Sequence, residues 1–238
     1  MQEGRDILDK VLRQEKKFLI SQAEFRRFSA YLENFMISDP HNGADGYLIR
    51  SLYFDSINDR DFDEKEQGTL LRRKIRLRNY GGNFPYAKLE MKQKQGADQL
   101  KRSLTVPKAD GIRLVGGDYS VLLNYEEPFA GECFAMMNMY CYRPKTVVQY
   151  NRKAYIAKEN KIRITFDNNI VANEANYNIF DDKLPLYPVF DKYNVVLEVK
   201  YNGFLLSYIK DLLAMVDRSE LSVGKYSLAR GVSMHYSF

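Results

Sequence analysis

The residues best suited to chemistry in this sequence are lysines and arginines that stand at every second position of a predicted strand. In residues 69–80, TLLRRKIRLRNY, the basic side chains Arg72, Lys74, Arg76 and Arg78 alternate with a set dominated by Leu71, Ile75 and Leu77. Alternate residues of a strand point to the same face of a sheet. This segment is therefore predicted to have one basic face and one apolar face.

Four more segments repeat this alternation: residues 13–20, 87–94, 161–167 and 195–201. The polar positions that share a face within each segment are Arg13, Glu15 and Lys17; Lys88, Glu90, Lys92 and Lys94; Arg163, Thr165 and Asp167; and Glu198 and Lys200. The positions between them are mostly apolar, so each segment would present one charged face and pack the other.

An ordinary antiparallel sheet with one solvated face would produce the same pattern. Here, however, Lys74 and Arg76 would lie on a strand adjacent to the one that carries Lys92 and Lys94. Like charges directly opposite each other destabilise a sheet. A bound polyanion removes this repulsion, and the closely spaced oxygens of a triphosphate or polyphosphate suit both arginine forks and lysine ammonium groups. We therefore expect this face to bind a chain of phosphates.

Three glutamates, Glu15, Glu90 and Glu198, are expected on the same face as these cations. Carboxylates do not bind phosphate directly, but their hard oxygens suit Mg²⁺ or Mn²⁺ when such an ion bridges phosphates and keeps some of its water. Salt bridges to neighbouring lysines explain each glutamate equally well. The sequence leaves these two alternatives open.

The rest of the chain predicts further strands and the helices that would support them. Strands are expected over residues 47–55, 101–106 and 146–156 and in a short stretch near the C-terminus, a short helix or loop over 58–68, and mostly helix over 115–142. Ser21 and Glu24 form a capping-box pattern that opens a helix. Its core side would carry Phe25, Phe28, Leu32 and Phe35. An amphipathic helix is expected over residues 204–216.

Strands with one charged and one apolar face predict an α+β fold. We expect a closed antiparallel β-barrel of about eight strands, with a polar interior that forms a tunnel and with helices around the outside. No internal repeat or linker divides the sequence, so residues 1–238 are expected to form a single domain.

Composition argues against several other classes of protein. The 36 Lys and Arg against 31 Asp and Glu leave a net charge of only +5, which does not by itself require a nucleic acid partner. The opening residues lack a signal-peptide core and no stretch approaches a membrane span, so we expect a cytoplasmic protein without direct membrane insertion. Cys133 and Cys141 are expected to be buried, reduced thiols. The two histidines, His41 and His235, are too few for a histidine metal cluster.

Six short motifs in order resemble a known family over nearly the whole chain. They are RSLYFD within residues 47–55, KIRLRNYG at 74–81, LEMK at 89–92, YNRKAY at 150–155, LEVKYNG at 197–203 and SVGKYSLAR at 222–230. This set is similar to the catalytic domain of the vacuolar transporter chaperone family, the polyphosphate polymerase branch of the triphosphate tunnel metalloenzymes. The resemblance implies a tunnel that takes the terminal phosphate of ATP, adds it to a growing polyphosphate chain, and uses Mn²⁺ or Mg²⁺.

Matched residue by residue and combined with the strand pattern, the resemblance implies a set of site residues. The candidate catalytic residues are Arg76, Arg78, Lys92, Arg152 and Lys225, and the candidate substrate-binding residues are Lys17, Lys74, Lys94, Lys101, Arg50, Arg163 and Lys200. Glu198 would hold the metal, with Glu15 and Glu90 as further candidates. Arg13 stands where hydrolytic and cyclase members have the first of two glutamates, which favours the polymerase branch.

Three other functions compete with a polymerase. A tripolyphosphatase or nucleoside triphosphatase of the same superfamily would use water as the acceptor, and a polyphosphate-binding module would catalyse nothing. A single-stranded nucleic acid binder is disfavoured because the basic residues alternate with aliphatic rather than aromatic side chains. The expected partners are thus ATP and inorganic polyphosphate, with no nucleic acid and with a possible membrane-protein partner for polyphosphate export.

Overall fold

The fold is built on one antiparallel sheet. In this computed structural model, the structure describes residues 13–81, 84–96, 98–189, 191–216 and 224–234. The strands are β1 (Arg13–Ser21), β2 (Ile37–Ser38), β3 (Tyr47–Ser56), β4 (Leu71–Asn79), β5 (Tyr86–Gln95), β6 (Asp98–Pro107), β7 (Tyr142–Ile156), β8 (Arg163–Asn173), β9 (Tyr187–Pro188) and β10 (Asn194–Asn202). All the strands expected over residues 13–20, 47–55, 69–80, 87–94, 101–106, 146–156, 161–167 and 195–201 are present.

Helices occupy the connections between these strands. They are α1 (Gln22–Glu33), α2 (Arg60–Glu66), α3 (Lys108–Val115), α4 (Pro128–Met139), α5 (Ser207–Ala214) and α6 (Lys225–Met234), with 3₁₀ turns η1 (Tyr119–Asn124) and η2 (Glu159–Lys161). The predicted capping box opens α1, because the Glu24 amide donates to Ser21 Oγ at 3.2 Å and the Ser21 amide donates to Glu24 Oε2 at 2.7 Å.

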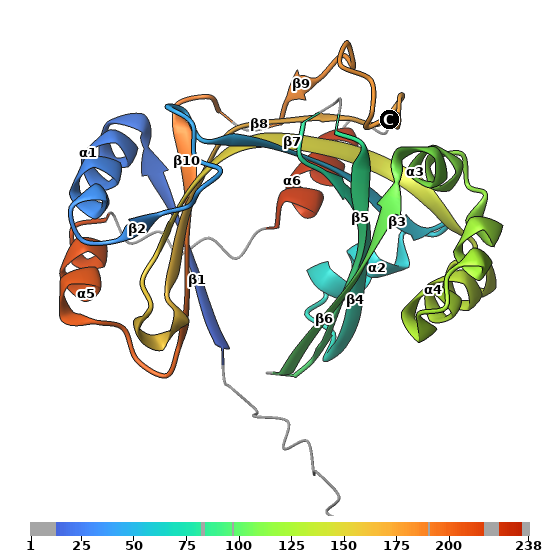
Figure 1. The fold of residues 1–238 in the computed structure, drawn as a ribbon, viewed down its shortest axis with the longest axis horizontal. Coiled ribbons are helices and arrows are strands. Elements are labelled where there is room, and N and C mark those ends of the chain that lie inside the picture. Colours follow the sequence, from blue (N-terminus) through green and yellow to red (C-terminus); the bar gives the residue numbers. More distant parts are fainter. Residues whose placement is uncertain (1–12, 82–83, 97, 190, 217–223, 235–238) are drawn as a thin grey trace, which may run out of the picture.

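The sheet curves into an arch that is not closed. Its main path runs β1-β10-β8-β7-β3-β4-β5-β6, and β2 and β9 pair beside it with β7 and β8. Among the described residues β1 pairs with β10 and β6 with β5, and no ladder joins β1 to β6 (Figure 1). The expectation of a closed barrel is therefore wrong. Charged side chains such as Lys16 on β1 and Arg102 on β6 occupy the two edge strands, and charge on an edge strand opposes further pairing.

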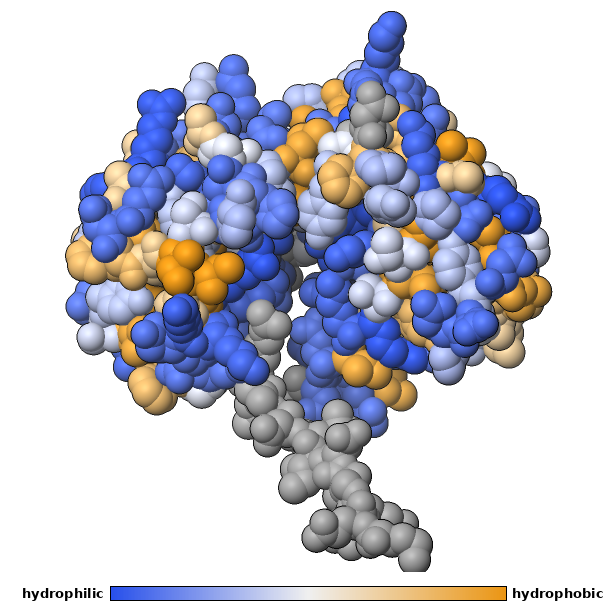
Figure 2. Space-filling view, in the orientation of Figure 1, coloured by the Kyte–Doolittle hydropathy of each residue, from blue (hydrophilic) through white to orange (hydrophobic). Residues whose placement is uncertain are grey.

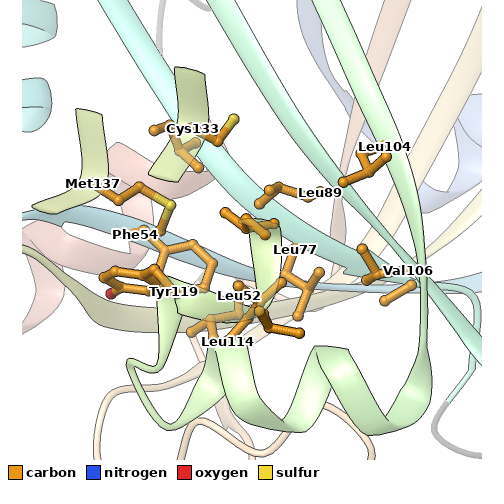
Figure 3. Close-up of a cluster of buried hydrophobic side chains, with 14 of the residues drawn as sticks. Leu52, Phe54, Leu77, Leu89, Leu104, Val106, Leu114, Tyr119, Cys133 and Met137 are labelled. Carbon is orange, nitrogen blue, oxygen red and sulfur yellow. The ribbon is translucent and has the colours of Figure 1, made fainter. Parts of the chain in front are cut away.

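The outer, convex face of the arch carries two apolar cores. On one side α3, η1 and α4 cover β4, β5 and β6, and residues such as Leu77, Leu89 and Met137 are fully buried there (Figure 3). On the other side α1 and α5 cover β1, β10 and β8 through side chains such as Phe28 and Ile209. The predicted apolar strand faces thus pack outward, and the charged faces are left for the concave side.

Helix α6, which the sequence analysis did not predict, lies inside the arch (Figure 1). The short strand expected near the C-terminus is not present among residues 224–234 that the structure describes there. Tyr226 and Ala229, three residues apart and therefore on one face of the helix, pack against Ile49 and Tyr150 on the concave face of the sheet. The interior is consequently apolar beneath α6 and polar beyond it.

Two smaller expectations are also corrected. Helix α1 ends at Glu33, so Phe35 falls beyond the amphipathic face and is 58% exposed, whereas Phe28 and Leu32 are buried as expected. Both cysteines are free, but only Cys133 is buried, because Cys141 follows the end of α4 and is exposed. None of the described helices is long and apolar enough to cross a membrane.

Gly46 controls how β3 meets β7. It adopts φ +90°, and a Cβ added there would collide with the backbone of Arg152 and Lys153. Gly46→Ala should therefore lower the free energy of unfolding by more than about 3 kcal/mol. Gly68→Ala is the matched control, since Gly68 also has a positive φ (+70°) but open space around it; it should cost about 1 kcal/mol. If urea unfolding showed equal losses of free energy for Gly46→Ala and Gly68→Ala, the close contact of Gly46 with the backbone of Arg152 would be contradicted.

Candidate functional site

A cavity of about 1240 Å³ fills the concave side of the arch, and Figure 2 shows the hollow between the two halves of the molecule. Its wall is made by side chains from β1, β4, β5, β6, β7, β8, β10 and α6, with Tyr53 from β3, Arg60 and Glu64 from α2 and Met136 from α4. Of the described residues, fourteen lysines and arginines line it against four aspartates and glutamates. A wall with this excess of positive charge suits a polyanionic ligand.

The structure brings together all but two of the site residues predicted from the sequence. Those that line the cavity are Glu15, Lys17, Lys74, Arg76, Arg78, Lys92, Lys94, Lys101, Arg152, Arg163, Glu198, Lys200 and Lys225. The two that do not are Arg50 and Glu90.

Arg50 points away from the cavity, so the expectation that it faces inward is wrong. It shares its strand face with Leu52 and Phe54, which are buried in the outer core. Its guanidinium donates to the carbonyl oxygens of Ile179 and Asp181 at 3.0 and 2.6 Å and thereby holds the segment that follows β8. Strand parity alone could have identified this orientation.

Glu90 is a buried counter-ion beneath the cavity wall. It lies 2.6 Å from Arg76, 2.5 Å from Lys101 and 3.8 Å from Arg78. Burial opposes ionisation of this carboxyl, but the charges of Arg76 and Arg78 outweigh burial and lower the pKa of Glu90 to about 2. Of the two alternatives left open by the sequence, the salt bridge describes Glu90, and its expected metal-binding role is not supported by its position.

Asp167 organises the cations at the middle of the arch and was not predicted as a site residue. Asp167 is fully buried and accepts two parallel hydrogen bonds from Arg152, at 2.6 and 2.8 Å. It also forms an ion pair with Lys225 at 2.5 Å. Burial opposes its ionisation, but these two cations hold the pKa of Asp167 below its usual value. A signal existed in the sequence, because Asp167 shares its strand face with Arg163 and Thr165.

Glu198 and Glu15 form a second acidic group, on β10 and β1. Both carboxylates contact Lys200, and Glu15 also contacts Lys17 at 2.7 Å. Burial opposes ionisation of Glu198, but Lys200 and Arg152 hold its pKa well below the usual range. Glu198 is therefore an anion at neutral pH that faces the cavity.

Thr165 supplies an unsatisfied oxygen beside Glu198. The two residues are direct partners on β8 and β10, and the buried Thr165 hydroxyl has no hydrogen-bond partner among the described residues. No three Asp, Glu, His or Cys side chains of the described chain gather into a metal cage. Two carboxylates and an orphaned hydroxyl fit a Mg²⁺ or Mn²⁺ ion that takes its remaining ligands from water and substrate phosphates.

One part of the wall has no carboxylate to neutralise it. Lys74 lies directly opposite Lys92, and Arg72 directly opposite Lys94, on the paired strands β4 and β5. None of these four forms an ion pair with a described residue. Burial first, and then the charges of Arg76 and Lys200, lower the pKa of Lys92 to about 7; burial is also the main cause of the lowered pKa of Lys74.

Aromatic rings separate and support the cations. Lys74 Nζ lies 5.8 and 5.4 Å from the ring centroids of Tyr53 and Tyr226, and Lys225 Nζ lies 4.7 Å from that of Tyr150. Burial opposes ionisation of Tyr53, but Arg76 and Lys74 outweigh it and lower the pKa of its hydroxyl to about 8. These contacts are cation–π interactions, which stabilise Lys74, a lysine with no ion pair to a described residue, and add to the ion pair of Lys225 with Asp167.

Comparison with known proteins gives a family and a fold. The family model described as the VTC domain matches residues 12–234. Among solved structures, a proposed adenylate cyclase from Bacillus halodurans is similar at 13% identity and a TM-score of 0.53, with 89% of this chain and 95% of that chain covered. A protein from Pyrococcus horikoshii has 11% identity and a TM-score of 0.49 over 92% and 99% of the two chains. No curated protein matches this chain.

Removing the charge of Asp167 should destabilise the protein. Asp167→Asn leaves Lys225 buried without its ion-pair partner and Arg152 with only Glu198, 3.9 Å away, so the free energy of unfolding should fall by about 3 kcal/mol. Added tripolyphosphate should restore part of that loss by supplying negative charge. Asp118→Asn is the control, because Asp118 pairs with Arg113 at the surface and should change little. A Tm equal to wild type for Asp167→Asn would show that the ion pairs of Asp167 with Arg152 and Lys225 do not stabilise the site.

Lys92 should couple phosphate binding to proton uptake. At pH 8 it is mostly neutral in the free protein, and a bound phosphate chain should restore its proton. The affinity for tripolyphosphate, relative to Lys92→Met, should therefore fall as pH rises from 7 to 9, and near pH 7 the variant should bind about tenfold more weakly. Isothermal titration at several pH values measures both effects.

Lys92 should also make the free energy of unfolding depend on pH, with a trend opposite to that of the binding affinity. Its folded-state pKa lies below that of an unfolded lysine, so the unfolded chain binds more protons between pH 7 and about 10. Without ligand, wild type should therefore gain stability relative to Lys92→Met as pH rises above 7. Lys88→Met, on the same strand outside the cavity wall, should show neither trend. If the free energies of unfolding of Lys92→Met and wild type changed with pH in parallel, the lowered pKa of Lys92 would be contradicted.

Proposed function

Because this chain belongs to the VTC domain family, which confirms the resemblance seen in its sequence, we propose that it is a polyphosphate polymerase. The proposed reaction transfers the terminal phosphate of ATP to a growing polyphosphate chain bound in the cavity. ATP and inorganic polyphosphate are the proposed partners, and the proposed activity is that of a metal-dependent phosphotransferase.

The observation that carries this proposal is the row of cations on β4 and β5 without carboxylate partners. Lys74 and Lys92 face each other, as do Arg72 and Lys94, along one wall of the cavity. Such repulsion is offset only when a ligand brings several negative charges at short, regular spacing. A chain of phosphates has this property, whereas a single carboxylate or phosphate would neutralise only part of the row.

The cations held by carboxylates are suited to a different task from the cations in the row. Arg152 and Lys225 on Asp167, and Arg76 and Arg78 beside Glu90, are fixed before substrate arrives. Fixed donors stabilise charge that develops on the transferred phosphoryl oxygens without reorganising during the reaction. We assign the γ-phosphate of ATP to these fixed groups and the acceptor chain to the row. Lys17 and Lys101, which pair with Glu15 and Glu90 but lie on the more exposed edge strands, are also assigned to the acceptor chain.

The transfer itself needs no nucleophilic side chain. A terminal oxygen of the acceptor chain attacks the γ-phosphorus, and a new P–O–P bond forms. The bond from that phosphorus to the β–γ bridging oxygen breaks, and ADP leaves with its electron pair. The protein contributes alignment of the two chains and neutralisation of their charge, which are the main sources of catalysis in phosphoryl transfer.

Glu198 and Glu15, with Thr165 nearby, are the residues that would hold a Mg²⁺ or Mn²⁺ ion. Bound there, the ion would neutralise charge on the phosphates and hold them in place. Lys200 contacts both carboxylates in the free protein and would have to release them or share them with the ion. Glu198→Gln should consequently raise the metal concentration that the reaction requires.

Incubation with ATP, Mn²⁺ and a trace of pyrophosphate tests the proposal. A ladder of polyphosphate should appear on a gel, and a chelator should abolish it. Arg152→Ala should lower kcat/KM by about 10²- to 10³-fold, because it removes a fixed donor to the transferred group, while Lys88→Ala should leave it unchanged. Stoichiometric orthophosphate would instead identify a hydrolase, and binding of polyphosphate without turnover would identify a binding module.

A further inference from the structure

The two edge strands of the arch border one side of the cavity. Side chains of both strands line it, Glu15 and Lys17 from β1 and Gln99 and Lys101 from β6. Within the described residues, β1 hydrogen-bonds along its length to β10 and β6 to β5, and neither pairs with the other (Figure 1). The cavity wall is therefore a sheet on three sides, with a seam between β1 and β6 that no ladder closes.

Both sides of the seam present lysines to the cavity. Lys17 on β1 and Lys101 on β6 face it, and Lys200 and Lys92 stand beside them on the next strands. Lys17 pairs with Glu15 at 2.7 Å and Lys101 with Glu90 at 2.5 Å, each within its own side of the seam. An anion that enters between the two edges therefore meets ammonium groups on both sides.

The lysines at the seam are more exposed than the cations at the middle of the arch. The side chains of Lys101 and Lys17 at the edges are 46% and 26% exposed. Those of Arg152 on β7 and Lys225 on α6 are each only 11% exposed. An anion that arrives at the seam therefore meets hydrated lysines first and the fixed, more deeply buried cations afterwards.

We propose that the cavity is loaded sideways through the seam between β1 and β6, so that it binds internal segments of a linear polyphosphate as well as chain ends. This inference rests on the proposed function, which makes polyphosphate the ligand. A closed tunnel must be threaded by a free end. A groove open along its length accepts any segment of the polymer, and the number of places at which one chain can dock then grows with its length.

Polyphosphate blocked at both ends distinguishes lateral loading from threading. A long chain carrying biotin–streptavidin at each end should bind with an on-rate and Kd within about threefold of the unblocked chain. For unblocked chains the on-rate per molecule should rise with length. Loss of binding on end-blocking, or an on-rate that does not rise with length, would overturn lateral loading. Failure of tripolyphosphate to bind would instead overturn the proposed function, and lateral loading with it.

A cross-link across the seam supplies the converse measurement. Leu19→Cys on β1 and Ser103→Cys on β6 share the faces of Lys17 and Lys101 on their strands. In a Cys141→Ser background that removes the exposed native thiol, these two positions are treated with a flexible bismaleimide long enough to span the seam. The bridged protein should still bind tripolyphosphate but should bind the end-blocked chain at least tenfold more slowly. The same variant treated with a monofunctional maleimide controls for the modification. Equal binding of the end-blocked chain to bridged and unbridged protein would show that the seam is not the entrance.

Discussion

Repulsion between buried positive charges is the constraint on which the rest of this structure depends. A fold that turns so many lysines and arginines toward one cavity can be stable only if most of them are neutralised. Three buried carboxylates, Glu90, Asp167 and Glu198, do this for the deepest cations. The row on β4 and β5 has no such partner among the described residues, and burial, followed by the charges of Arg76 and Lys200, lowers the pKa of Lys92 within it.

The apolar cores on the outer side of the sheet offset the electrostatic cost of the charged cavity. Helices on the convex side bury the aliphatic faces of the strands, and this burial stabilises the fold against the electrostatic cost of the cavity. Helix α6 adds an internal support. Tyr226 donates to the buried Asp55 at 2.7 Å, and Arg230 pairs with Asp59 at 2.7 Å and Glu174 at 3.1 Å. Together these contacts fix the helix that delivers Lys225 to the cavity.

The open seam lies where the two edge strands meet the cavity. Among the described residues no ladder joins β1 to β6, and the lysines on these strands pair with carboxylates on their own side, Lys17 with Glu15 and Lys101 with Glu90. The shape of the sheet thus leaves one side of a strongly basic cavity unpaired by backbone hydrogen bonds.

The sequence by itself determined the strands, their inward and outward faces and most of the cavity cations, because alternation along a strand is a local property that folding preserves. Arg152, Lys101 and Lys225 were predicted from the family resemblance instead, and Arg60 and Arg73 were not predicted. It also predicted the capping box at Ser21. Tertiary structure alone decided which carboxylate neutralises which cation, that Asp167 joins Arg152 to Lys225, and that the sheet stops short of closing. Those outcomes depend on distances between residues far apart in the chain. Helix α6 was not predicted for the same reason, since its helical form is supported by packing inside the arch.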